Sequence, residues 1–145
     1  MKSAENTATP NKKAGMIQKI ISIAGFLLFS MFSTLQGNDV GQYGTAQWLT
    51  YAWLIGYALL AFLCLFNALR PLPPRVFITL AGVTFALALF RASQIDWSQP
   101  LFCFTAPKEF ADRNPAGNET GGLVIMTLWL LLVWWANKKF FRSQR

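Results

Sequence analysis

The side chains best suited to chemistry in this sequence stand at the ends of long apolar segments. Carboxylates, carboxamides and an arginine gather there, and such groups can bind an ion or a small polar molecule, or pair with one another. Six of them are predicted to share one membrane depth. We call these residues the outer polar cluster, and they are Gln36, Asn38, Asp39, Arg91, Gln94 and Glu119.

Two members of this cluster, Arg91 and Asp39, need a partner. The helix dipole disfavours negative charge at a helix C-terminus, which is where Asp39 stands. An arginine costs up to about 2.5–3.5 kcal/mol at the membrane centre and less near the edge, so it usually faces a partner. Asp39 and Glu119 are the carboxylates available to Arg91. Three interpretations stay open: solvated interface residues, an ion-pair clamp between helices, and a binding or transport site.

The remaining composition excludes several kinds of catalytic and metal site. The chain contains no histidine, and its two cysteines, Cys64 and Cys103, lie in an apolar run and in a polar loop. The usual ligand sets for zinc and haem are therefore missing, as is a Ser-His-Asp triad. We expect no metal, no cofactor and no enzymatic activity. An enzyme would have to use Asp39, Arg91 and Glu119 at the membrane interface.

Four apolar segments must position these residues. The chain has 145 residues, of which 54% are hydrophobic and 13% are charged, whereas a soluble domain carries about 25% charged residues. A hydrocarbon core about 30 Å thick needs about 17–25 helical residues, which each segment supplies. The sequence predicts an all-α membrane protein, a bundle of four transmembrane helices at about 17–35, 48–69, 76–93 and 121–137.

The parts of the chain outside this transmembrane domain (residues 16–137) are polar. Residues 1–15 lack periodicity, which predicts a disordered cytoplasmic tail, and residues 138–145 form a basic cytoplasmic tail. The outer loop between the third and fourth helices, residues 94–120, is long for a compact bundle. Its aromatic residues favour a partial lid or a short amphipathic helix that lies in the interface.

The distribution of charge predicts how the chain is oriented. Ten of the thirteen basic residues lie in the N-terminal flank, the proline-rich turn at residues 70–75 and the C-terminal tail, together with one of the six acidic residues. The positive-inside rule therefore predicts that both termini are cytoplasmic. The net charge of +7 comes from basic residues that gather at the ends of apolar segments. Because they do not line a groove, nucleic acid is not an expected partner. We expect an integral, multi-pass protein of the lipid bilayer, in the inner membrane if the organism is bacterial.

Small residues recur four positions apart on two of the segments. Ala52 and Gly56 form one pair, and Gly82 and Ala86 form the other. In lipid, such pairs let helix backbones approach closely. We expect both pairs to pack within the bundle, and a homo-oligomer stays open.

Two motifs resemble those of the transmembrane protein 220 family. Leu35-Gln36-Gly37-Asn38-Asp39 ends the first helix shortly before Trp48, and Glu119-Thr120-Gly121-Gly122-Leu123 opens the last helix. The Pro-Asp-Pro that follows the Asn-Asp pair in that family is replaced here by Val40-Gly41-Gln42. The resemblance implies a small four-helix, multi-pass membrane protein of unknown biochemistry, and it names no activity.

The sequence favours a non-catalytic membrane protein that acts as an accessory or interaction subunit of a larger membrane assembly. The small size and the absence of ionisable groups from the centres of the helices support this interpretation. The alternative is a binder or transporter of a small molecule or ion that uses the outer polar cluster. Transporters, however, usually place ionisable groups or broken helices near the membrane midplane.

Overall fold

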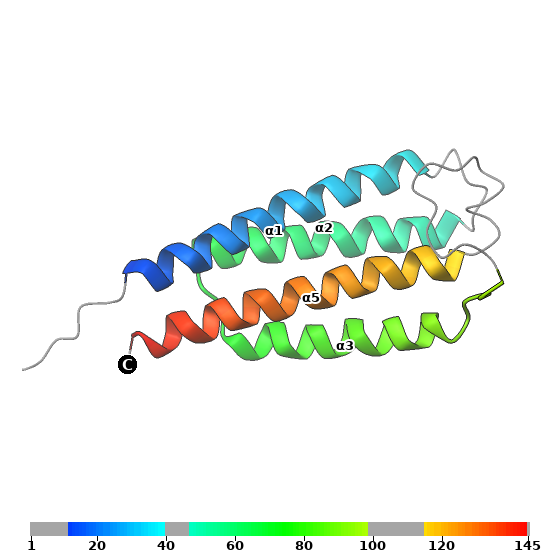
Figure 1. Cartoon of the computed structure of the whole chain (residues 1–145). Coiled ribbons are helices and arrows are strands. Elements are labelled where there is room, and N and C mark those ends of the chain that lie inside the picture. The colour runs from blue at the N-terminus through cyan, green and yellow to red at the C-terminus, as the bar shows by residue number, and fades with distance from the viewer. Residues whose placement is uncertain (1–11, 40–46, 99–114, 145) are drawn as a thin grey trace, which may run out of the picture.

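Four helices run side by side as a bundle in the computed structural model, which describes residues 12–39, 47–98 and 115–144 (Figure 1). All four are long and apolar enough to cross a membrane, and the described ranges contain no strand. This confirms the predicted all-α fold of four transmembrane helices. The helices are α1 (Lys12–Asp39), α2 (Gln47–Leu69), α3 (Pro74–Ala92) and α5 (Pro115–Arg142).

The first and last helices are longer than the apolar pattern indicates. The prediction of a disordered tail is wrong for residues 12–15, because these residues form the first turn of α1. The first turn of α1 is helical because it packs against the last turns of α5. A Cβ at Gly15 would lie 3.5 Å from the ring of Phe140. Residues 1–11 lie outside the described residues.

The end of the chain also differs from the prediction. Residues 138–142 continue α5 instead of forming a separate tail, and α5 begins at Pro115, six residues before the predicted start. Proline suits the first turn of a helix, where its missing N–H leaves no hydrogen bond unmade. The predicted interfacial lid falls largely on residues 99–114, which lie outside the described residues.

The bundle consists of two antiparallel helix pairs. α1 packs along α2, α3 packs along α5, and contacts between α1 and α5 join the pairs (Figure 1). The start of α1, the α2–α3 turn and the end of α5 lie together at one end of the bundle. We call this the basic end, because it holds every described Lys and Arg except Arg91; they are Lys12, Lys13, Lys19, Arg70, Arg75, Lys138, Lys139 and Arg142.

Aromatic rings fill the core where the two pairs meet. The ring of Phe29 on α1 stacks on Tyr57 of α2 with the centroids 6.3 Å apart. Phe29 also meets Trp129 of α5 edge-on at 6.5 Å, and Phe77 buries its whole side chain from α3. Each helix therefore contributes to one continuous core, completed by Leu60, Ala61, Cys64, Ala81, Ala88, Leu123, Met126, Leu130 and Val133.

Two glycines let these large rings approach the backbone. A Cβ at Gly25 of α1 would collide with the indole of Trp129 and would lie 2.9 Å from the sulfur of Cys64. A Cβ at Gly122 of α5 would lie 2.5 Å from the hydroxyl oxygen of Tyr57. Real Cβ atoms do not approach so closely, so both positions require glycine for packing and not for backbone freedom.

The predicted small-residue pairs do not take this role, and that prediction is wrong. A Cβ at Gly56 or Gly82 would meet nothing within 4 Å among the described residues, and Ala52 and Ala86 are exposed. The reason lies in the pairing of the helices. α2 and α3 turn their packed sides toward α1 and α5, so these pairs fall on the outer sides.

We expect Gly25→Ala to destabilise the bundle by about 1–3 kcal/mol, because the added methyl group overpacks a filled space. Gly56→Ala is the matched control, since the same change there meets open space and alanine favours a helix by about 1 kcal/mol. Thermal unfolding of both variants in one detergent measures the difference. Equal Tm values for the two variants would contradict the packing described for Gly25.

Candidate functional site

The structure brings two members of the outer polar cluster into an ion pair. Arg91 stands in the last turn of α3 and Glu119 near the start of α5, and the Nε and Oε2 atoms are 2.5 Å apart. The side chains are 24% and 12% exposed, so both charges are largely withdrawn from solvent. Because α3 and α5 pack along each other, the pair joins them at the end opposite the basic end.

Two further polar side chains stand beside this pair. Nη1 of Arg91 donates a hydrogen bond to Oε1 of Gln94, which follows α3 directly. The indole of Trp53 on α2 lies close to Glu119, but its buried Nε1 makes no hydrogen bond with the described residues. Groups from α2, α3 and α5 therefore converge on one carboxylate.

Of the other members of the outer polar cluster, the structure describes the side chain of Gln36 alone. Gln36 is half-buried near the end of α1 and makes no hydrogen bond with the described residues. The backbone of Asn38 and Asp39 forms the last turn of α1, but the side chains of both residues lie outside the described residues. An interaction between Asp39 and Arg91 stays a prediction, whereas Glu119 is the partner that the structure shows.

A further carboxylate lies at the same end of the bundle, in the turn after α3. The backbone N–H and the hydroxyl of Ser98 donate hydrogen bonds to Oδ1 of Asp96 at 3.0 and 2.7 Å. These bonds favour the charged form and hold the pKa of the Asp96 carboxyl below its ordinary value. Asp96 is thus an exposed anion on the face that carries the ion pair.

A second polar group lies at the basic end, and the sequence analysis did not single it out. Gln18 and Ser22 of α1, Asn67 of α2 and Asn137 of α5 are each at most 1% exposed. We call these four residues the buried amide network. They lie inside the helix bundle, where water cannot satisfy them, so each polar group depends on another.

Two asparagines form the centre of the buried amide network. Nδ2 of Asn137 donates to Oδ1 of Asn67 at 2.8 Å, and Nδ2 of Asn67 donates back to Oδ1 of Asn137 at 3.2 Å. Both also hold Leu72 in the α2–α3 turn: its N–H donates to Asn67 at 2.8 Å, and its carbonyl accepts from Asn137 at 2.7 Å. Prolines flank Leu72 and lack an N–H, so the side chains provide the hydrogen bonds that fix this turn.

α1 joins the buried amide network through its first polar turns. Ser22 accepts a hydrogen bond from Nδ2 of Asn67 at 2.7 Å and donates to the carbonyl of Gln18 at 2.8 Å. Nε2 of Gln18 donates to the carbonyl of Asn67 at 2.7 Å. Oε1 of Gln18 is buried and has no partner among the described residues. The network thus ties α1, α2, α5 and the α2–α3 turn together.

In the sequence, the residues of the buried amide network look like the ordinary polar residues at the ends of transmembrane segments. Asn67 and Asn137 stand in the last turns of apolar runs, where an asparagine is easily taken for an interface residue. The spacing of Gln18 and Ser22, four residues apart, was the available signal, because it places both on one face of a helix. The pairing of Asn67 with Asn137, seventy positions apart, follows only from the packing of the helices.

At both ends of the bundle, the described polar side chains bind one another and so join helices. Hydroxyl groups add further contacts between helices in the middle of the bundle. The hydroxyl oxygens of Thr84 on α3 and Thr127 on α5 lie 2.8 Å apart, and Ser33 of α1 donates to the carbonyl of Leu54 on α2 at 3.1 Å. No three His, Cys, Asp or Glu side chains come together within the described ranges in a way that could hold a metal ion.

This fold, with polar contacts closing both ends of four apolar helices, defines a small multi-pass membrane protein. Residues 28–135 match the family described as Transmembrane family 220, helix. The chain belongs to this family, which confirms the resemblance found in its two motifs. A search of curated proteins found no match, and a search of solved structures found none.

The structure gives a physical account of the second motif, residues 119–123. Glu119 forms the ion pair with Arg91, Gly122 leaves room for the hydroxyl of Tyr57, and Leu123 is buried in the core. The motif therefore sets the contacts of α5 with both α2 and α3.

Removing one amide of the central asparagine pair should cost stability. Asn137→Ala leaves the Leu72 carbonyl without its donor and Asn67 without its partner, so we expect a loss of about 1–3 kcal/mol. Asn118→Ala, an exposed asparagine of the same helix, is the matched control and should change little. Denaturation in detergent of the single variants and of Asn67→Ala/Asn137→Ala measures the coupling. Strictly additive losses would contradict the pairing.

Removing the arginine of the ion pair should destabilise the contact between α3 and α5 at the end of the bundle opposite the basic end. Arg91→Ala leaves a largely buried carboxylate without its counter-charge, and its remaining contact with solvent limits the expected loss to about 1–2 kcal/mol. Glu119→Gln in the Arg91→Ala background should restore part of this stability, and Arg75→Ala is an exposed control. The measurements are Tm in detergent and protein abundance in cells. If Arg91→Ala changes neither, the pair is not a clamp.

Proposed function

We propose that the chain is a non-catalytic accessory subunit that docks on a larger membrane assembly through its outward-facing helix surfaces. The polar groups that could serve chemistry are engaged with one another at both ends of the bundle. Arg91 and Glu119 neutralise each other, and the buried amide network holds helices together. The surfaces that remain for a function face outward, and between the two ends they are apolar.

The observation that carries this proposal is an unbroken row of large side chains along the outside of α2. The row extends over almost the full length of the helix, and each member is at least 49% exposed. The members follow one another at intervals of three or four residues, which places them on one helix face. We call this the α2 stripe: Trp48, Tyr51, Ile55, Leu59, Phe62, Phe66 and Leu69.

The composition of the α2 stripe supports a protein partner. Its intervals of three and four residues place all seven side chains on one helix face, where they can insert between those of a neighbouring helix. Four of the seven residues are aromatic, and aromatic residues are enriched in the cores of protein–protein interfaces.

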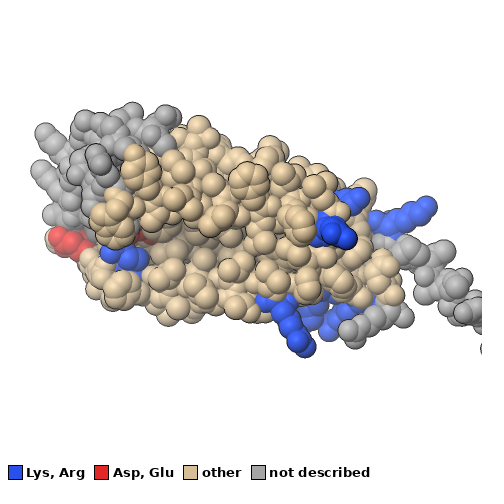
Figure 2. Space-filling view, turned by 180° about the vertical axis from the view of Figure 1, so that it is seen from behind, with Lys and Arg blue, Asp and Glu red and all other residues tan. Residues whose placement is uncertain are grey.

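The orientation of the bundle follows from charge. Seen from behind, most of the lysine and arginine side chains gather at the basic end, and acidic side chains lie at the opposite end (Figure 2). The opposite end holds Arg91 with Asp96 and Glu119. We propose on the positive-inside rule that the basic end, with both termini, is cytoplasmic. A docking partner would then meet the α2 stripe within the membrane.

The test is native mass determination after mild extraction from the original membrane. We expect the chain to migrate within a larger assembly, and Phe62→Leu/Phe66→Leu to release it, because leucine keeps the apolar character but removes the ring. Phe85→Leu/Phe90→Leu makes the same exchange at exposed positions of α3 and is the matched control. We expect the control to leave the assembly intact.

Migration of the native chain alone, or as a homo-oligomer, would contradict the accessory role. The alternative, a binder or transporter of a small molecule or ion, would then be favoured. The observation that supports it is the convergence of the Arg91 guanidinium and the Trp53 indole on the carboxylate of Glu119. A ligand that binds this group would stabilise the free chain by mass action.

A further inference from the structure

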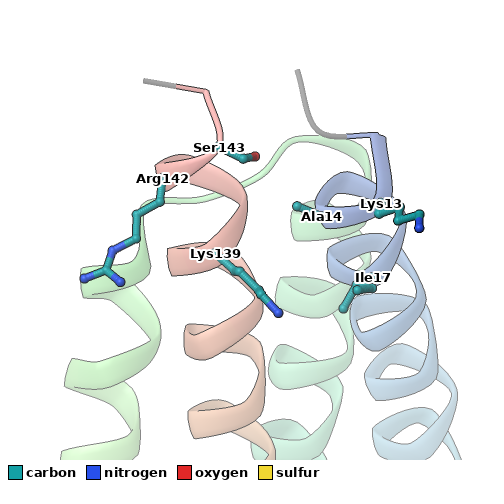
Figure 3. A pocket seen from close by; sticks show the side chains of 6 residues that line it. All are labelled: Lys13, Ala14, Ile17, Lys139, Arg142 and Ser143. Atoms are coloured by element: carbon teal, nitrogen blue, oxygen red, sulfur yellow. The ribbon is translucent and has the colours of Figure 1, made fainter. Parts of the chain in front are cut away.

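The basic end of the bundle carries a hollow that neither the ion pair nor the buried amide network uses. Its volume is about 440 Å³, and it lies open between the start of α1 and the end of α5 (Figure 3). Half of its lining residues are cations and none is acidic. The lining residues are Lys13, Ala14, Ile17, Lys139, Arg142 and Ser143.

Two cations of this hollow, Lys139 and Arg142, face no acidic residue of the described ranges. Lys139 extends from α5 into the space toward α1, and Arg142 and Lys13 stand on its two sides with their charged groups directed outward (Figure 3). Lys139 and Arg142 form no ion pair within the described residues. The acidic residues of the described ranges all belong to the opposite end of the bundle.

A smaller hollow of about 290 Å³ lies on the other side of α5. Arg142 lines both hollows. The second hollow adds Lys138 and the aromatic ring of Phe141, next to the two prolines that begin α3. The end of α5 is therefore surrounded by cations that face two shallow spaces.

Tryptophan rings indicate the depth at which these cations lie. The ammonium of Lys138 lies 4.7 Å from the ring centroid of Trp134, and that of Lys139 lies 4.8 Å from the ring centroid of Trp135. Tryptophan in membrane proteins is enriched at the level of the lipid headgroups. We therefore expect the ammonium groups to lie near the level of the lipid phosphates.

The lining of the hollow combines charge with apolar surface. Ala14 and Ile17 form its wall on α1, and the exposed surface of α1 continues as Met16, Ile20 and Ile23. A soluble anion would use only the charges. An amphiphile with a phosphate and acyl chains would use both parts.

The start of α1 adds a further reason for an anion here. The first four N–H groups of a helix have no partner within it and carry the positive end of the dipole. The first turn of α1 contains no acidic residue and bears two lysines, Lys12 and Lys13, which the dipole disfavours. The positive end of the dipole would favour a phosphate bound close to this turn.

We propose that this hollow binds the phosphate of an anionic phospholipid, with Lys139 and Arg142 on the headgroup and the acyl chains along the apolar sides of α1 and α5. Basic hollows between transmembrane helices are suited to anionic headgroups at this membrane depth. The proposal does not depend on the accessory role, because the hollow lies apart from the α2 stripe.

The test is native mass spectrometry of the full-length chain released from nanodiscs that contain equal amounts of phosphatidylcholine and phosphatidylglycerol. We expect the native chain to retain phosphatidylglycerol in excess. Lys139→Gln/Arg142→Gln should lower the ratio of bound phosphatidylglycerol to phosphatidylcholine about tenfold, because two cations at the phosphate are lost. Arg142→Gln alone changes one exposed residue at the helix end and should give an intermediate ratio.

Arg70→Gln/Arg75→Gln is the matched control, since it removes the same charge at the basic end from residues that line neither hollow. We expect this control to keep the native ratio. An equal fall in the control would assign the effect to general charge and overturn the proposal, as would a native ratio in the Arg142→Gln variant. Displacement of the lipid by excess inorganic phosphate would identify a soluble phosphate as the ligand and would also overturn it.

Discussion

A side-chain amide within a bundle of apolar helices has no water to bind, so it must find another polar group or destabilise the fold. Asn67 and Asn137 satisfy this requirement with each other and with the backbone of Leu72. The hydrogen bonds of these two asparagines to Leu72 fix the position of the α2–α3 turn. Because α3 begins at that turn, it runs along α5, and the far ends of the two helices meet where Arg91 faces Glu119.

The two ends of the bundle are thus closed by different kinds of polar contact. Neutral amides suit the interior of the bundle at the basic end, where a buried ion pair would carry a large desolvation cost. Charged groups suit the other end, where Arg91 and Glu119 keep some contact with solvent. Between them, Gly25 and Gly122 let aromatic rings lie against the backbone, and the interior is filled with side chains.

The outward surfaces differ in kind, and each suits a different component of the membrane. The α2 stripe is apolar and regular, which suits a neighbouring helix. The basic end is charged and hollowed around the end of α5, which suits an anionic headgroup. Neither surface needs a change in the bundle itself, because the polar contacts at both ends hold the helices independently of what covers them.

Segment length, apolar composition and local motifs are enough to establish the membrane class, the four helices and the family from the amino-acid sequence. The sequence also indicated that Arg91 needs a carboxylate, since a charge near the apolar region rarely stands alone. It could not decide between Asp39 and Glu119, nor reveal the pairing of Asn67 with Asn137, because both depend on which helices become neighbours. The same reason explains why glycines in apparent packing pairs stayed on the outside while Gly25 did not. Contacts between distant residues are properties of the packed bundle, and only the tertiary structure decided them.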